Sequence, residues 1–272
     1  MLAPTTDSGI VRAAAAAGLY YPRDAEGLRS ALHSLLGQET QVATRLPKAL
    51  VVPHAGYAYS GSVAAAAFRK LSIADAAGIR HVVLLGPSHR VKVRGLALPS
   101  CEYFATPFGQ VRINAQARLR LRELGLAGVA DAPHAFEHSL EVQLPFLQAL
   151  LGDFDLLPVA VGMAPPEQVA RALEAVWGGA ETLVVVSTDL SHHHTHVEAL
   201  ALDEQTAQRI IERRSDLSES QACGADSLNG LLEVARHRGL QVELLDRRTS
   251  GDTSGDNQRV VGYGSFALYE AA

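Results

Sequence analysis

The sequence has few cysteines and no long apolar run, and each shortage excludes a class of protein. Its two cysteines, Cys101 and Cys223, lie far apart and form no CxxC motif. The sequence therefore predicts neither a disulfide framework nor a cysteine-based zinc site. So few cysteines are typical of a reducing compartment, and we expect a cytoplasmic protein. No apolar run approaches the length needed to cross a bilayer, so we expect no membrane association.

An excess of positive charge is also absent. The chain has 24 Lys and Arg against 29 Asp and Glu, which gives a formal net charge of -5. Without a basic block or an aromatic-interleaved patch, a nucleic-acid partner is not expected. The alanine run in "VRAAAAAGLYYP" directly follows Arg12 and lacks the apolar core of a signal peptide. We expect this segment to belong to the mature protein.

What the sequence does contain is a series of short apolar runs typical of buried strands. The first four are nearly continuous, as in strands buried on both faces of a sheet, whereas the last alternates more, which favours an edge or antiparallel strand. These runs are Ala49–Pro53, His81–Pro87, Asp155–Val161, Thr182–Ser187 and Arg259–Leu268.

Segments with helical spacing lie between the predicted strands. They are Arg23–Gly37, Ser60–Leu71, Pro165–Gly179, Val197–Arg213 and Glu219–Arg238. Strands that alternate with helices predict an α/β fold with a mostly parallel central sheet flanked by helices. Because no linker-like stretch or internal repeat interrupts the pattern, we expect a single domain over residues 1–272.

Histidines follow three of the predicted strands. His54 comes after the first, with Tyr57 and Tyr59 close behind, His89 follows the second, and "STDLSH" brings Asp189 and His192 after the fourth. Ligands of α/β sheets bind beyond the carboxyl ends of the strands. One such histidine alone would be expected only to hydrogen-bond the backbone, but three favour a site for a metal that imidazole binds well, such as Fe, Zn or Cu.

A further histidine lies in "HAFEHSLEVQLPFLQALL", residues His134–Leu151. If this segment is one helix, His138 and Glu141 share a face. Such a histidine could act as a general acid or base or hold an anionic substrate. The alternative is an exposed helix start, in which Glu137 and Glu141 complement the helix dipole.

The loop before the last strand, Thr249–Gly264, contains two "SGD" triplets with Asp252 and Asp256. One of these carboxylates could reach the metal. The alternative is a solvated turn, because Gly, Asp and Ser are good turn formers.

The tract "STDLSHHHTH", Ser187–His196, is the densest histidine cluster in the chain. No local geometry lets all four histidines bind one ion, since neighbouring side chains of an extended segment point in opposite directions. We expect Asp189 and His192 to face the pocket. The other three histidines, at 193, 194 and 196, are expected on the surface.

Several of these segments together resemble the Memo family. The matching motifs are "PHAGYAYSG", "LLGPSHR", "EHSLEVQLPFL" and "STDLSHH", in this order, with "AGLYYP" near the start and "TSGDTSGDNQRVVGYG" near the end. The bacterial and archaeal members of the family are called AmmeMemoRadiSam system protein B. The resemblance covers nearly the whole chain.

The resemblance implies a fold similar to that of the class III extradiol dioxygenases, which are non-haem iron enzymes. By motif, His54 and His89 match the family's two metal-ligand histidines. His192 matches another pocket histidine and Asp189 a pocket carboxylate, and His138 falls where the family also has a histidine.

The chain departs from human-type Memo proteins at one position. Those proteins present a cysteine in the C-terminal loop as a metal ligand, and the matching position here is Thr253. Either Asp252 replaces that ligand or the third ligand is lost. Asp252 would complete a set of two histidines and one carboxylate, which suits Fe(II). We therefore expect a divalent metal, Fe(II) in the first place, with Zn or Cu as alternatives.

Three functional hypotheses follow. The first is an Fe(II)-dependent, oxygenase-like enzyme for an unknown small-molecule substrate, with the metal on His54, His89 and Asp252. Its acid and base groups would be His138, His192 and Asp189, and its pocket would be lined by Tyr57, Tyr59 and Glu141.

The second hypothesis is a zinc-type hydrolase in which His54, His89 and His192 hold the metal. The third is a non-catalytic metal- or ligand-binding partner protein. The bacterial family name implies association with a radical-SAM protein and an AMMECR-domain protein. The sequence supports no prediction of the oligomeric state.

Overall fold

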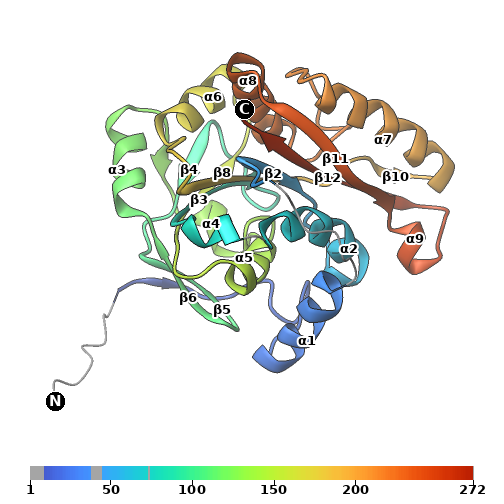
Figure 1. Ribbon diagram of the computed structural model, residues 1–272, viewed down its shortest axis with the longest axis horizontal. Helices are drawn as coiled ribbons and strands as arrows, with labels where there is room; N and C mark the ends of the chain where they lie inside the picture. Colours follow the sequence, from blue (N-terminus) through green and yellow to red (C-terminus); the bar gives the residue numbers. More distant parts are fainter. Residues whose placement is uncertain (1–8, 38–44, 73, 272) are drawn as a thin grey trace.

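The computed structural model describes residues 9–37, 45–72 and 74–271 (Figure 1). Its helices are α1 (Ala25–Leu36), α2 (Tyr57–Phe68), α3 (Ala115–Glu123), α4 (Ala132–Ala135), α5 (Leu144–Leu150), α6 (Pro166–Ala175), α7 (His196–Ile211), α8 (Ala225–Arg238) and α9 (Gly251–Ser254). Its strands are β1 (Val11–Arg12), β2 (Ala49–Val52), β3 (His81–Pro87), β4 (Leu96–Leu98), β5 (Tyr103–Thr106), β6 (Gly109–Ile113), β7 (Gly128–Val129), β8 (Asp155–Val161), β9 (Thr182–Ser187), β10 (His192–His194), β11 (Gln241–Thr249) and β12 (Val260–Tyr269).

The centre of the molecule is a parallel sheet in the order β6-β8-β3-β9-β2. Beyond β2 the sheet continues with β12 and β11, which are antiparallel to their neighbours. On the other side, β5 pairs antiparallel with β6. Because β3, β9 and β2 are adjacent and parallel, their carboxyl ends lie side by side at one edge of the sheet.

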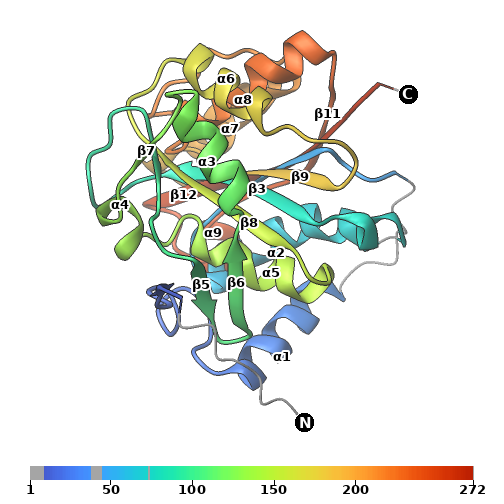
Figure 2. The same cartoon turned by 90° about the vertical axis from the view of Figure 1, so that its left-hand side faces the viewer.

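Helices cover both faces of this sheet, as Figures 1 and 2 show from two directions. Alternate residues of β2 pack to opposite sides. Ala49 and Val51 belong to the core beneath α3, α6, α7 and α8, and Leu50 and Val52 belong to the core beneath α1, α2 and α5. Burial on both faces explains why the central strands are nearly continuous apolar runs. It confirms the predicted α/β fold with a mostly parallel sheet.

The last predicted strand is β12, which is antiparallel, one of the two expected alternatives, and pairs with β2 on one side and β11 on the other. The short strands β1, β4, β5, β6, β7 and β10 were not predicted, and neither was the longer strand β11. Its sequence "QVELLDRRT" is rich in charged residues, and most of its residues are only partly buried or exposed, so the apolar signal is weak.

The single helix predicted over residues 134–151 is wrong. The structure has the short helix α4, then an irregular stretch, then a 3-10 turn at Glu141–Gln143 and finally α5. The Glu137 carboxylate accepts hydrogen bonds from the backbone N–H groups of His138 and Ser139. These groups thus find partners outside a helix, which is one reason the helix can stop here. None of the helices in the described residues is long and apolar enough to cross a membrane.

Candidate metal centre

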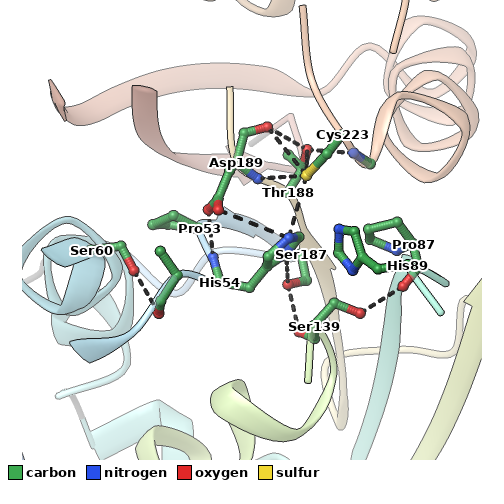
Figure 3. A network of polar contacts seen from close by, with 12 residues as sticks. Pro53, His54, Ser60, Pro87, His89, Ser139, Ser187, Thr188, Asp189 and Cys223 are labelled. Atoms are coloured by element: carbon green, nitrogen blue, oxygen red, sulfur yellow. Dashed lines mark hydrogen bonds and ion pairs between the residues drawn. The ribbon is translucent and has the colours of Figure 1, made fainter. Parts of the chain in front are cut away.

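His54 lies directly beyond the buried strand β2, at the carboxyl edge of the sheet (Figure 3). Its side chain is 2% exposed. Its backbone N–H donates to Asp189 Oδ1 at 2.7 Å, and its Nδ1 lies 2.9 Å from Ser187 Oγ. Ser187 is the last residue of the adjacent strand β9, and Asp189 lies two residues beyond it. With Nδ1 engaged by Ser187, Nε2 is the ring nitrogen that can bind an ion, and its contact in the structure is the Cys223 Sγ at 3.3 Å.

His89 and His138 reach the same place from two other segments. His89 follows β3, and His138 lies in the irregular stretch after α4. Their Nδ1 atoms lie 2.9 Å and 3.2 Å from the same oxygen, Oε1 of Glu137. As at His54, the arrangement leaves Nε2 of each ring for a ligand.

The three histidines form a group that could hold one metal ion. Their ligand atoms all lie within 4.8 Å of one another. The ring centroids are 5.1 Å apart for His54 and His89, 5.4 Å for His54 and His138, and 4.9 Å for His89 and His138. Imidazole nitrogens about 2.0–2.1 Å from a tetrahedral ion are separated by roughly 3.4 Å. Modest ring rotations would bring the three donors to that spacing, so the residues fit a divalent ion.

The charges at this site also suit a cation. Burial lowers the pKa of His54 well below its ordinary value, and the neighbouring His89 and His138 lower it further. His54 is therefore neutral, which is the form that binds metals. Burial opposes ionisation of Glu137, but hydrogen bonds from His138 and His89 outweigh it and lower the pKa of this carboxyl. An ionised carboxylate thus lies behind two of the imidazoles.

Two further groups lie beside His54. Oδ2 of Asp189 is 4.0 Å from His54 Nε2, and the Cys223 Sγ is 3.3 Å from the same nitrogen. Burial raises the pKa of Asp189 despite its hydrogen bond from the His54 N–H. Burial, followed by the Asp189 charge, raises the pKa of the Cys223 thiol to about 12. Burial beside the site thus disfavours the charged form of both groups.

An aromatic ring from the N-terminal segment packs against the site. Tyr20 stacks on His138 with ring centroids 4.1 Å apart and an angle of 17° between the planes. The backbone carbonyl of Tyr20 accepts a hydrogen bond from the N–H of Tyr57, at the start of α2. The segment before α1 therefore forms one wall of the histidine group.

Asp252 and His192 lie outside the three-histidine group found in the described residues. Asp252 accepts a hydrogen bond from the Thr249 N–H at 2.7 Å and lies 3.9 Å from His196. The third residue that brings a nitrogen donor close to those of His54 and His89 is instead His138. From the sequence we expected His138 to act as an acid or base. His192 is partly buried in β10, where its Nδ1 lies 2.8 Å from the Leu190 carbonyl. A ligand function for Asp252 and a catalytic one for His192 stay predictions.

The residues expected to line a substrate pocket are more scattered. Tyr57 is buried, and its hydroxyl donates to the Val142 carbonyl at 2.7 Å. Tyr59 is 47% exposed on α2. Glu141 is fully buried, and its two oxygens accept hydrogen bonds from the Arg12 and Tyr21 side chains and from two backbone N–H groups. These contacts show Glu141 as an anchor for the N-terminal segment, and a contact with substrate stays a prediction.

Sequence reasoning missed four features of the site. His138 was not assigned as a donor, and Glu137, Tyr20 and Cys223 were not assigned to the site at all. Glu137 carried a usable signal, because it directly precedes His138. Tyr20 lies in "AGLYYP", which the sequence marked only as an end motif. Cys223 had no signal, since it lies in the loop before α8 and reaches His54 only through folding.

Comparisons with known proteins show which family this chain is similar to. The family model described as Memo-like protein matches residues 12–267. A MEMO1 family protein of Aquifex aeolicus is 34% identical over 265 residues, which are 93% of this chain and 97% of the relative. One from Methanopyrus kandleri is also 34% identical, over 94% of this chain and 98% of the relative. One from Thermotoga neapolitana is 36% identical over 82% of this chain and 83% of the relative. The chain therefore belongs to the Memo family.

Proposed function

We propose that this protein is a mononuclear metal enzyme, with Fe(II) as the ion and an oxygenase-like reaction on a small molecule. The observation that supports it is the convergence of His54, His89 and His138 within 4.8 Å. All three rings have Nδ1 beside a side-chain oxygen, which leaves Nε2 of each ring to bind an ion. Bound Fe(II) would supply open coordination positions for O2 and for a chelating substrate.

The residues around this point suit such a reaction. His89 is one third exposed, so the group is accessible from solvent on that side. Asp189 Oδ2 and the Cys223 Sγ lie 4.0 Å and 3.3 Å from His54 Nε2, and these groups could exchange protons with a bound molecule. The Tyr20 ring on His138 limits the room on the opposite side. His192 would complete the set of proton carriers.

The test is to purify the protein without oxygen, measure its metal content and then follow O2 uptake with catechol-like compounds. We expect iron near one equivalent, and its loss in His54→Ala and His89→Ala together with O2 uptake. Iron bound equally well by both variants would refute the proposed site. Iron without O2 uptake by any such compound would refute the oxygenase chemistry.

A zinc-type hydrolase is the second candidate. It is favoured by the donor set itself, since three imidazoles and a water form a known catalytic zinc site, and Asp189 could accept the proton of that water. Stoichiometric zinc together with hydrolytic activity would replace the first proposal with this one. If the protein binds no metal, the third hypothesis is favoured, in which it is a non-catalytic partner of a radical-SAM protein and an AMMECR-domain protein.

A further inference from the structure

One buried carboxylate, that of Glu137, connects two of the three metal-binding histidines. Glu137 is 2% exposed. Its Oε1 lies 2.9 Å from His89 Nδ1 and 3.2 Å from His138 Nδ1, and its Oε2 accepts the backbone N–H of His89 at 2.6 Å. Oε1 also accepts the backbone N–H groups of His138 and Ser139. A single side chain thus holds the ring and the backbone of His89 and the backbone of His138. The His138 Nδ1 is buried beside Oε1 and has no hydrogen-bond partner among the described residues.

The carboxylate of Glu137 determines which nitrogen of the two imidazole rings carries the proton. An ionised carboxylate only accepts hydrogen bonds, so the His89 Nδ1, which is hydrogen-bonded to Oε1, must carry a proton. The His138 Nδ1 lies 3.2 Å from the same oxygen, where a proton is favoured because a lone pair would face a negative charge. A neutral imidazole protonated on Nδ1 has its lone pair on Nε2. A carboxylate in this place also makes the imidazole a stronger metal donor. Among the described residues, Glu137 supplies the carboxylate that lies beside these two Nδ1 atoms.

We infer that Glu137 is a positioning residue that sets both His89 and His138 to the Nδ1-protonated form and thereby makes them one paired unit of the metal site. This inference rests on the proposed metal site. It adds that the affinity for the ion depends on a residue that does not touch it. It also explains why the chain leaves helical geometry at residues 137–140, since a continuous helix would not offer the same backbone N–H groups to Glu137.

Glu141 provides a matched control in the same segment. It is buried as deeply as Glu137, but its oxygens accept from Arg12, Tyr21 and the N–H groups of Ala15 and Ala16, and from no histidine ring. Replacing either carboxylate by the amide of equal size removes a buried charge. Only the replacement at Glu137 changes the group that lies beside the Nδ1 atoms of His89 and His138.

The experiment compares Glu137→Gln with Glu141→Gln in the full chain by titration with Co2+, followed by the absorption of the bound ion. We expect E137Q to bind Co2+ about 10–100-fold more weakly than the unchanged protein. We expect E141Q to lose stability but to keep its Co2+ affinity within about threefold once folded. Equal affinity of E137Q and the unchanged protein overturns the inference, as does an equal loss in both variants. If E137Q does not fold, Glu137→Met replaces it, because Met has a side chain of similar length without the carboxylate, and unchanged affinity in that variant is the overturning result.

A second readout separates this inference from the proposed function. Nitrogen-15 NMR of the imidazoles in metal-free protein reports which nitrogen carries the proton. We expect Nδ1 protonation of His89 and His138 in the unchanged protein and in E141Q, and a mixture of forms in E137Q. If the protein binds no metal but shows this pattern, the metal enzyme is refuted and the function of Glu137 stands. If the pattern is the same in E137Q, the inference fails even where metal binding is found.

Discussion

Two regions of this molecule are rich in histidine, and they are built in opposite ways. In the tract Ser187–His196, four histidines follow one another closely, and the structure places them in the short strand β10 and at the start of α7. There the His192 ring contacts the Leu190 carbonyl and the His193 ring, and the His196 ring contacts Thr249 and Asp252. The other region gathers His54, His89 and His138 from three separate segments to within 4.8 Å.

The difference shows that convergence, and not density, makes a candidate metal site. Neighbouring residues on one strand point to opposite sides and cannot meet at one ion. His193 moreover adopts a left-handed backbone conformation with φ of 67° and is exposed. Adjacent parallel strands, by contrast, bring their ends to the same edge of the sheet. A loop anchored by Glu137 then adds the third donor.

The strongest test of this comparison is the loss of one convergent histidine. His54→Ala should lower the affinity for Co2+ at least about 100-fold, because it removes one of three donors. His193→Ala in the tract should leave the affinity unchanged. Co2+ titration of both variants provides the measurement. Similar losses in the two variants would mean that the tract shares in the site.

A change in the residues that anchor the N-terminal segment beside the three histidines should also lower the stability of the protein. Arg12 and Glu141 form a buried ion pair at 2.6 Å, with side-chain exposures of 7% and 0%. Arg12→Met leaves the carboxylate buried without its partner, and we expect a loss of about 3–5 kcal/mol in the free energy of unfolding. His193→Ala, at an exposed position, should change it by less than about 0.5 kcal/mol. Urea unfolding curves measure both values, and a small loss in R12M would contradict the importance of this anchor.

The buried His134 should make the region beside the site sensitive to acid. Burial lowers its pKa to about 4, and its Nε2 lies 3.0 Å from the Ala97 carbonyl. The pKa of a histidine in the unfolded chain is about 6.5, so the unfolded state binds the proton more readily. The stability that His134 contributes is therefore complete above pH 6.5 and is lost as the pH falls towards 4. The expected loss is about 3 kcal/mol.

Unfolding curves of metal-free protein between pH 7 and pH 4 test this expectation. Burial also lowers the pKa of His54, which acts in the same direction. His134→Gln can keep a donor for the Ala97 carbonyl and has no group that titrates in this range. Its stability should fall less steeply with pH. An unchanged slope would show that His134 does not titrate as described.

The smallest effect is expected at Asp252. This residue accepts from the Thr249 N–H and lies near His196, away from the three-histidine group of the described residues. Asp252→Ala should therefore change Co2+ affinity by no more than about twofold. A loss of tenfold or more would restore the set of two histidines and one carboxylate that the sequence suggested.

The parts of the fold and site that depend on local pattern could be predicted from the sequence. β2, β3 and β9 are continuous apolar runs, and His54 and His89 follow the first two directly. The parts that depend on distant partners could not. The break in the 134–151 helix involves Glu137, whose carboxylate also binds His89. Glu141 is held by Arg12 and Tyr21, which lie far away in the chain.

The location of a bound ion tests the central claim most directly. Crystals grown with Zn2+ or Co2+ and measured at the absorption edge of that metal give an anomalous difference map. The account predicts one strong peak about 2.0–2.1 Å from Nε2 of His54, His89 and His138. A peak at His192–His196 instead, or no peak at the three histidines, would contradict it.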